Sequence, residues 1–378
     1  MKKIVKLGDV LDYEQPTKYI VESTNYADSF KIPVLTAGKT FILGYTDEGK
    51  GVFDNLPVII FDDFTTAFHY VDFPFKVKSS AMKILKPVKE KADLKFLYYK
   101  MQTISMDTDL HKRYWISKYS QVEIPLPPLA TQQKIAAILD AADELRQKDK
   151  ALVAKYDELT QALFLDMFGD PVTNPKGWEK VPFGNHIDVL TDYHANGSYE
   201  TLNEHVTLKN TTDYALMVRT TDLEKNNFDK DVISISEEAY NYLEKTKVFG
   251  GEMIINKIGS AGKVYMMPYL NRPVSLGMNA FMLRFKNTLN STFIFFQLKT
   301  KYGEHEINKR VKGAVTKTIR KDAVREIPII LAPLKLQNQF AERVKAIEEQ
   351  KSIAQASSLK SEELFNSLLQ KAFNGELV

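Results

Sequence analysis

Lysine, arginine and hydroxyl side chains gather in two stretches of the chain. Residues 76–118 contain eleven Lys or Arg against four Asp or Glu, and residues 299–325 contain nine against three. Such stretches suit a surface that neutralises phosphate groups, although each alone could be an ordinary solvated face. Prolines follow both stretches, at Pro128 and Pro333. Because the charge excess recurs at equivalent places, we interpret it as an anion-binding feature.

Side chains that could contact phosphates or base edges occur on Gly-, Thr- and Lys-rich segments. Lys and Arg position a nucleic acid through phosphate contacts, whereas Arg, Asn, Ser and Thr can also reach base edges. We favour 257–263 and 312–320, where small residues allow close backbone approach and positive charge flanks them. The candidates in the first half are Thr36, Lys39, Thr40, Thr65, Thr66, Lys76, Lys78, Ser79, Lys112 and Arg113. The candidates in the second half are Tyr193, Asn196, Arg219, Thr220, Lys257, Ser260, Lys263, Lys312, Thr316, Lys317 and Arg320.

Motifs for other chemistries lack required residues. The "AGKT" at 37–40 lacks the first glycine of a phosphate-binding loop, and "GSAGKV" at 259–264 lacks the Ser or Thr after its lysine. Asp93-Leu94-Lys95 has the D-x-K spacing of some nucleases, but no pattern places a partner acid. The six histidines include no close pair of metal ligands, and no Asn-Pro-Pro-aromatic motif of adenine methylation occurs. We therefore predict no catalytic residue and no metal site.

Composition limits the class of protein further. The 378 residues are enough for two or three domains, and the net charge of +3 is too small to decide anything. There is no cysteine, so neither disulfides nor cysteine-ligated zinc can stabilise the fold. No apolar run approaches the roughly 20 residues of a membrane span, and the N-terminus has no apolar signal segment. We expect a cytoplasmic protein.

An internal repeat relates the two halves of the chain. Placing Pro128 opposite Pro333, an offset of 205 residues, aligns the following forty residues without a gap. Segments of forty residues that keep equal length suggest a spacer rather than a generic core helix. The aligned pairs include Gln132 with Gln337, Ala136 with Ala341, Lys155 with Lys360, Glu158 with Glu363, Leu163 with Leu368 and Phe168 with Phe373.

The aligned segments are predicted to be long helices that pair with each other. A helix of forty residues is roughly 60 Å long, and a single apolar stripe on it requires a partner. The second helix has a polar middle at 355–361, which weakens its stripe. The stripe on the first helix consists of Ile135, Ile138, Ala142, Leu145, Leu152, Tyr156, Leu159 and Leu163, interrupted by Asp149.

The segments before the helices resemble each other more faintly and indicate strands. Apolar runs rich in Val, Ile, Phe and Tyr alternate there with Gly-, Ser- and Thr-rich turns. The fold class is therefore α+β: two strand-rich domains separated by two long helices that form an antiparallel coiled coil, as a pseudo-twofold repeat. The predicted boundaries are domain 1 at 1–125, first helix at 126–170, domain 2 at 171–328 and second helix at 329–378.

With this organisation, the chain resembles a specificity subunit of a type I restriction–modification system. The most specific resemblance lies in "IPLPPLATQQKIAAILDAAD" at 124–143, "LFLDMFGDPVTNPKGW" at 163–178 and "LLQKAFNGELV" at 368–378. The resemblance implies two target-recognition domains, each recognising one half of a split DNA sequence, with the helices setting the gap. It also implies a non-catalytic chain that binds no cofactor.

The resemblance implies partners as well. Two methyltransferase subunits would use S-adenosylmethionine to methylate adenine, and restriction and translocation subunits, where present, would use ATP and Mg²⁺. Two other classes stay open: a structural coiled-coil adaptor without DNA recognition, and an enzyme that acts alone, such as a nuclease. Salt-sensitive DNA binding would argue against the adaptor, and incubating the chain alone with DNA and Mg²⁺ would test the nuclease.

Overall fold

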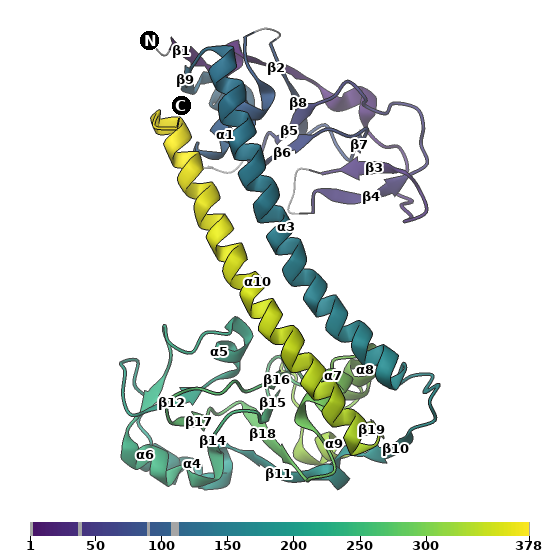
Figure 1. The fold of residues 1–378 in the computed structure, drawn as a ribbon, viewed down its shortest axis with the longest axis vertical. Coiled ribbons are helices and arrows are strands. Elements are labelled where there is room, and N and C mark those ends of the chain that lie inside the picture. Colours follow the sequence, from purple (N-terminus) through teal and green to yellow (C-terminus); the bar gives the residue numbers. More distant parts are fainter. Residues whose placement is uncertain (1–2, 37–39, 89–90, 107–112, 378) are drawn as a thin grey trace. The chain divides into compact units, whose positions relative to one another are not determined.

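The structure is a computed structural model that describes residues 3–36, 40–88, 91–106 and 113–377 (Figure 1). Its internal contacts divide the chain into two compact units. Unit 1 comprises Met1–Ala151 and Ala354–Val378, and unit 2 comprises Leu152–Ile353. Each unit therefore contains one strand-rich globule and a part of each of two long helices.

The globule of unit 1 is built from two sheets and a short strand pair. One sheet has the order β2-β8-β5-β6, the second has the order β4-β3-β7, and β1 pairs with β9. In the second sheet β3 is antiparallel to β4 and parallel to β7. The strands are β1 (Lys3–Lys6), β2 (Leu11–Glu14), β3 (Ile32–Leu35), β4 (Ile42–Thr46), β5 (Val58–Asp62), β6 (Phe68–Val71), β7 (Lys76–Val77), β8 (Met82–Pro87) and β9 (Glu123–Leu126).

The globule of unit 2 repeats this topology. Its sheets have the orders β11-β18-β15-β16 and β13-β12-β17-β14, and β10 pairs with β19. Again the central pair β12 and β17 is parallel, and β13 is antiparallel to β12. The strands are β10 (Glu179–Pro182), β11 (Ile187–Asp192), β12 (Ala215–Val218), β13 (Ser234–Ile235), β14 (Lys247–Val248), β15 (Met253–Asn256), β16 (Val264–Met266), β17 (Val274–Leu276), β18 (Ala280–Phe285) and β19 (Pro328–Leu331).

Short helices cover and connect these sheets. Helix α1 in unit 1 and helix α7 in unit 2 each follow the strand next to the sheet edge, β8 and β18, as the repeat requires. The α-helices are α1 (Leu94–Gln102), α2 (Tyr114–Ser117), α4 (Tyr199–His205), α5 (Thr220–Lys225), α6 (Glu237–Tyr242), α7 (Ser291–Leu298), α8 (Lys301–Asn308) and α9 (Lys321–Arg325). The 3-10 turns are η1 (Leu7–Asp9), η2 (Pro16–Tyr19), η3 (Tyr119–Gln121), η4 (Phe183–His186), η5 (Tyr193–Asn196) and η6 (Glu244–Thr246).

Two long helices, α3 (Leu129–Phe168) and α10 (Leu334–Asn374), confirm the predicted helical segments. Within unit 1 they run antiparallel, because Arg146 pairs with Glu362 while the later Asp149 accepts a hydrogen bond from the earlier Ser357. The polar residue on α3 thus meets the polar middle of α10. Within unit 2, Lys351 forms an ion pair with Asp157 at 2.6 Å.

The face of α3 that packs differs from the predicted stripe. Ile135 and Ala142 are buried as expected, but Ile138, Leu145, Leu152 and Leu159 are 37–49 % exposed. Leu139 and Thr160 are buried where Ile138 and Leu159 were expected to be. On α10, Phe340, Ala354 and Phe365 are buried, while Leu364 is exposed.

The difference between the predicted and the observed packed face of α3 is explained by Arg146. Its guanidinium stacks on the ring of Phe365 at 4.1 Å and forms an ion pair with Glu362 at 3.0 Å. This arginine therefore belongs to the packed face, where its stem covers apolar surface while its charge is paired. Successive residues of a helix are about 100° apart around its axis. Because Arg146 lies on the packed face, the preceding Leu145 points away from that face.

A buried glutamine at the start of each long helix explains one pair in the sequence repeat. Gln132 accepts a hydrogen bond from the N–H of Asp93 at 2.9 Å and donates to the carbonyl of Pro127 at 2.9 Å. Gln337 accepts from the N–H of Asn290 at 2.8 Å and donates to Ala332 at 2.7 Å. Asp93 and Asn290 are the N-cap residues of α1 and α7. The same contact thus fastens a globule helix to a long helix in both units.

Replacing Gln132 with alanine is expected to lower the free energy of unfolding by about 1–3 kcal/mol, because it leaves the N–H of Asp93 and the carbonyl of Pro127, both half-buried, without their partner. Urea unfolding followed by tryptophan fluorescence measures this, since Trp115 is buried in unit 1. Gln133→Ala is the matched control, because Gln133 is exposed. Equal stability of the two variants would contradict the structural role of Gln132.

Candidate nucleic-acid interface

The two favoured stretches of unit 2 lie side by side. The first loop, 257–263, connects β15 to β16, and the second, 312–318, follows α8. Ile258 and Thr318 form a β-bridge, and the N–H of Gly259 donates to the carbonyl of Lys317 at 2.9 Å. The N–H of Ile319 donates to the carbonyl of Lys257 at 3.1 Å. We refer to residues 257–263 and 312–318 as the paired loops.

The second of the paired loops is a tight hairpin. Lys312 and Thr318 exchange backbone hydrogen bonds at 2.8 and 2.7 Å. Gly313 has a φ of +104°, and a Cβ there would lie 2.1 Å from the carbonyl oxygen of Thr316. Only glycine fits this position, so the hairpin tip has a defined backbone.

A buried carboxylate anchors the base of the paired loops. Asp192, at the end of β11, accepts hydrogen bonds from Lys257 at 2.8 Å and Lys321 at 2.7 Å. Both ammonium groups also lie over the ring of Phe281. Burial alone would raise the pKa of Asp192, but the hydrogen bonds from the two lysines outweigh it and leave the pKa lowered. The carboxylate therefore stays charged and fixes both lysines.

The remaining cations of this surface differ in whether they are paired. Lys263 forms an ion pair with Glu224, which raises the pKa of its ammonium group. Lys312, Lys317 and Arg320 are exposed, and none of them forms an ion pair with another residue in the described parts of the chain. Their charge is available to an external anion such as a phosphate. Ser260 and Thr316 are exposed on the same loops.

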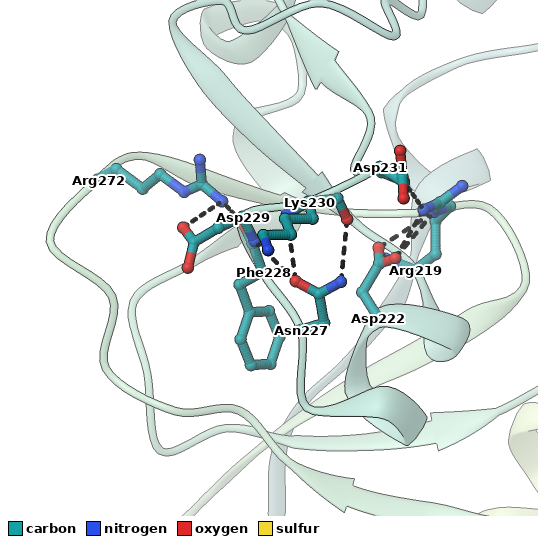
Figure 2. A network of polar contacts seen from close by, with 8 residues as sticks. All are labelled: Arg219, Asp222, Asn227, Phe228, Asp229, Lys230, Asp231 and Arg272. Carbon is teal, nitrogen blue, oxygen red and sulfur yellow. Dashed lines mark hydrogen bonds and ion pairs between the residues drawn. The ribbon is translucent and has the colours of Figure 1, made fainter. Parts of the chain in front are cut away.

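Arg219 and Thr220 lie at the start of α5, where Arg219 has internal partners. Figure 2 shows its guanidinium directed at the carboxylate of Asp222, with 2.7 Å between Nη2 and Oδ1, and at the carbonyl of Asp231. In the same network Arg272 donates to the carbonyl of Phe228. These contacts order the segment between α5 and β13, so the structure gives Arg219 a supporting position.

Tyr193 and Asn196 also make internal contacts. Tyr193 is buried in the core beside α4 and α6. Asn196 donates hydrogen bonds to the carbonyl of Tyr193 at 3.0 Å and to the hydroxyl of Thr246 at 2.9 Å, and accepts one from the N–H of Lys245. These contacts close the turn after β11.

Among the candidates in the first part of unit 1, some have internal partners and others are exposed. Lys76 is only 3 % exposed; its ammonium pairs with Glu48 at 2.8 Å. The hydrogen bond from Lys76 is the largest cause that lowers the pKa of Glu48 to about 2. Thr36 donates to the carbonyl of Thr40 at 2.8 Å, and Lys78 is exposed near the hydroxyl of Tyr26. Lys39 and Lys112 lie outside the described residues.

Two of the other candidates of unit 1 line a cavity of about 410 Å³. Ser79 and Arg113 line it together with the buried pair Asp63 and Lys83, whose charged atoms are 3.5 Å apart. Thr65 and Thr66 lie in the adjacent turn between β5 and β6, and Thr66 has a φ of +60°. These residues form the counterpart in unit 1 of the paired loops.

Equivalent backbone positions in the two units have different side chains. Asp63 follows β5 and Lys257 follows β15. The carbonyl of Asp63 accepts from the N–H of Tyr114 at 3.0 Å, as that of Lys257 accepts from Ile319 at 3.1 Å. The scaffold is thus conserved between the two repeats, whereas an acid in one repeat occupies the position of a base in the other. Each is neutralised by an ion pair, Asp63 with Lys83 and Lys257 with Asp192.

Sequence reasoning missed the anchor of the paired loops. Asp192 and Lys321 were not among the candidates, because no local spacing connects an acid at 192 with lysines at 257 and 321. The two aligned repeats offered no signal either, since Asp63 rather than a lysine occupies the equivalent of Lys257. The pairing of both β11 and β15 with β18, together with the hydrogen bond from the N–H of Ile319 to the carbonyl of Lys257, brings these residues together.

Within the described residues, no group of three or more His, Asp or Glu side chains could hold a metal ion. Over the same ranges, no helix is long and apolar enough to cross a membrane.

Repeated strand-rich globules, each joined to a long helix, define a protein built from two related modules. The chain matches the family model of the type I restriction modification DNA specificity domain over residues 2–154 and 175–360. It therefore belongs to this family, the non-catalytic DNA-recognition component of type I restriction–modification systems.

Two individual relatives each match a part of the chain. The chain is 52 % identical over 146 residues to the Escherichia coli EcoR124I/EcoR124II specificity subunit, over 35 % of this chain and 36 % of that protein. It is 23 % identical over 251 residues to the MjaVIII specificity subunit of Methanocaldococcus jannaschii, over 61 % of this chain and 56 % of that protein. These matches thus span about a third to just over half of the relatives.

Solved structures support the fold. The type I restriction–modification S subunit from M. genitalium superposes with a TM-score of 0.61 at 16 % identity, covering 99 % of this chain and 96 % of that one. A chain from a structural study of complex assembly and conformational transition of the type I system gives 0.51 at 16 % identity, with coverage of 99 % and 98 %.

Proposed function

We propose that each globule of this chain recognises one half of a split DNA site. The observation that supports this is the repeated scaffold with different side chains: Asp63 and Lys257 occupy equivalent positions, and the exposed cations Lys312, Lys317 and Arg320 form no ion pair within the described residues. Two copies of one scaffold can bind two half-sites in related ways, while their different loops select different bases. The candidate residues that lack internal partners, above all those of the paired loops, make the DNA contacts.

The long helices set the gap between the half-sites. Domains at 1–125 and 171–328 contact DNA, and helices within 126–170 and 329–378 fix their separation. Helices of 40 and 41 residues are long enough to span roughly 60 Å. A stiff spacer of this kind converts its own length into a preferred distance along DNA, as dimer geometry does for palindromic sites.

The same helices offer a surface to the methyltransferase. Ile138, Leu145, Leu152 and Leu159 recur every seven residues on α3 and are exposed. An exposed apolar stripe at this spacing suits a helix of a partner protein. In the proposed complex, two methyltransferase subunits bind S-adenosylmethionine and methylate adenine. Restriction subunits, where present, use ATP and Mg²⁺, this chain binds no cofactor, and the assembly works in the cytoplasm.

The test is to co-express the chain with its methyltransferase subunit and map methylated adenines by long-read sequencing. A split motif with two short halves and a fixed gap is the expected result. A continuous motif would contradict the two-headed arrangement. A soluble complex that leaves DNA unmodified and binds it without salt dependence would favour a structural adaptor instead.

A further inference from the structure

The tip of the second paired loop presents an apolar side chain to solvent. Val315 is 97 % exposed, the highest value among the large apolar residues that the structure describes. Isolated apolar residues on a surface are common, so exposure alone carries no argument. Here, however, Val315 lies at the end of a hairpin rather than on a flat face, and its neighbours Ala314 and Thr316 are exposed as well.

The backbone below Val315 is held in place. Two hydrogen bonds between Lys312 and Thr318 close the hairpin, and the contact from Gly259 to Lys317 ties it to the first paired loop. The second loop continues into α9, where Lys321 is fixed by Asp192. A tip supported in this way loses little conformational entropy on binding, so its contacts can contribute to affinity and specificity.

The charges around the tip indicate what Val315 meets. Lys312 and Lys317 lie on the same hairpin as Val315, Arg320 follows it, and no ion pair neutralises their charge within the described residues. An apolar partner protein would gain nothing from these cations, whereas DNA would place phosphates beside them. Between its phosphates the major groove exposes one apolar group, the 5-methyl group of thymine.

We propose that Val315 contacts the 5-methyl group of a thymine in the half-site recognised by unit 2, and so helps to determine its sequence. This rests on the proposed function and names the chemistry of one base contact. Lys312, Lys317 and Arg320 bind the flanking phosphates, which positions the hairpin in the major groove. Val315 then recognises the methyl group through packing, since an isopropyl group offers no hydrogen bond.

The test uses the complex of this chain with its methyltransferase and duplexes that contain the mapped site. Each thymine of the unit 2 half-site is replaced in turn by deoxyuridine, which lacks only the methyl group. For the protein with Val315, one replacement should weaken binding about fourfold, the effect of burying one methyl group. With Val315→Ala the same replacement should change affinity by less than about a factor of two.

Val172→Ala is the matched control, because Val172 is also exposed but lies in the turn after α3; it should keep the fourfold effect. The proposal is overturned if no thymine shows discrimination that depends on Val315 while sequence-specific binding persists, and the proposed function then survives. It is also overturned if Val315→Ala releases the methyltransferase, because the tip would then contact protein. If the unaltered complex binds no specific site, both the proposal and the proposed function fail.

Discussion

Replacing Lys312, Lys317 and Arg320 together with glutamine is expected to weaken binding of the assembled complex to its site about a hundredfold at about 150 mM salt. The three side chains are exposed, lie on or next to one hairpin, and form no ion pair within the described residues. Each phosphate contact adds about 0.9 to the slope of log affinity against log salt concentration, so the slope should fall by nearly three. Titrations of labelled duplex at several salt concentrations measure both quantities.

The matched control replaces Lys176, Lys180 and Lys286 with glutamine, which removes the same charge from the same unit. Lys176 precedes β10, Lys180 lies in β10 and Lys286 follows β18. The paired loops instead follow β15 and α8. The control should keep most of the salt dependence. If both triple variants lowered the slope of log affinity against log salt concentration by the same amount, the cations of the hairpin would have no special role in binding. The DNA interface would then lie elsewhere on the protein.

The architecture could be predicted from the sequence because it depends on repetition. An offset of 205 residues aligns Gln132 with Gln337 in the sequence, and these glutamines make equivalent contacts in the two units. Two prolines and a long apolar pattern were enough to place α3 and α10. Hydrophobic periodicity and helix-breaking prolines depend on residues that are close in the sequence. They can therefore be recognised without knowledge of tertiary contacts.

The packed face of α3 could not be predicted in the same way. Counting apolar residues selects Leu145, whereas in the fold the half-buried Arg146 pairs with Glu362 and stacks on the ring of Phe365. An arginine becomes suitable for a helix interface only when a carboxylate and a ring on another segment receive it. That information lies in residues more than two hundred positions away.

The fold sorts the residues of the candidate interface in a way that the sequence does not. The two favoured stretches are adjacent in the structure. Lys257 and Lys263, however, are paired with Asp192 and Glu224, so they support the loops, while Lys312, Lys317 and Arg320 remain for a ligand. A charge count cannot separate supporting cations from free ones, because the difference is made by acids brought close in the fold.

Lengthening both long helices by four residues is expected to lengthen the gap of the recognised DNA site while leaving both half-sites unchanged. A Glu-Ala-Ala-Lys segment would be inserted between Ala151 and Leu152 and another between Ile353 and Ala354, at the unit boundaries. The contact of Arg146 with Glu362 stays within unit 1, and that of Asp157 with Lys351 stays within unit 2. Long-read methylation mapping of cells that express the lengthened protein gives the new gap directly.

The expected change in the gap follows from helix geometry. Four residues add about 6 Å and about 40° beyond a full turn. Along DNA, 6 Å corresponds to about two base pairs, and 40° to about one, so the gap should grow by one or two base pairs. The same segment inserted in the exposed turn between Thr211 and Thr212 is the control, and should leave the gap as it was. A lengthened protein that still methylates only the original site would show that the helices do not set the distance between half-sites, and the spacing would then have to come from the methyltransferase subunits.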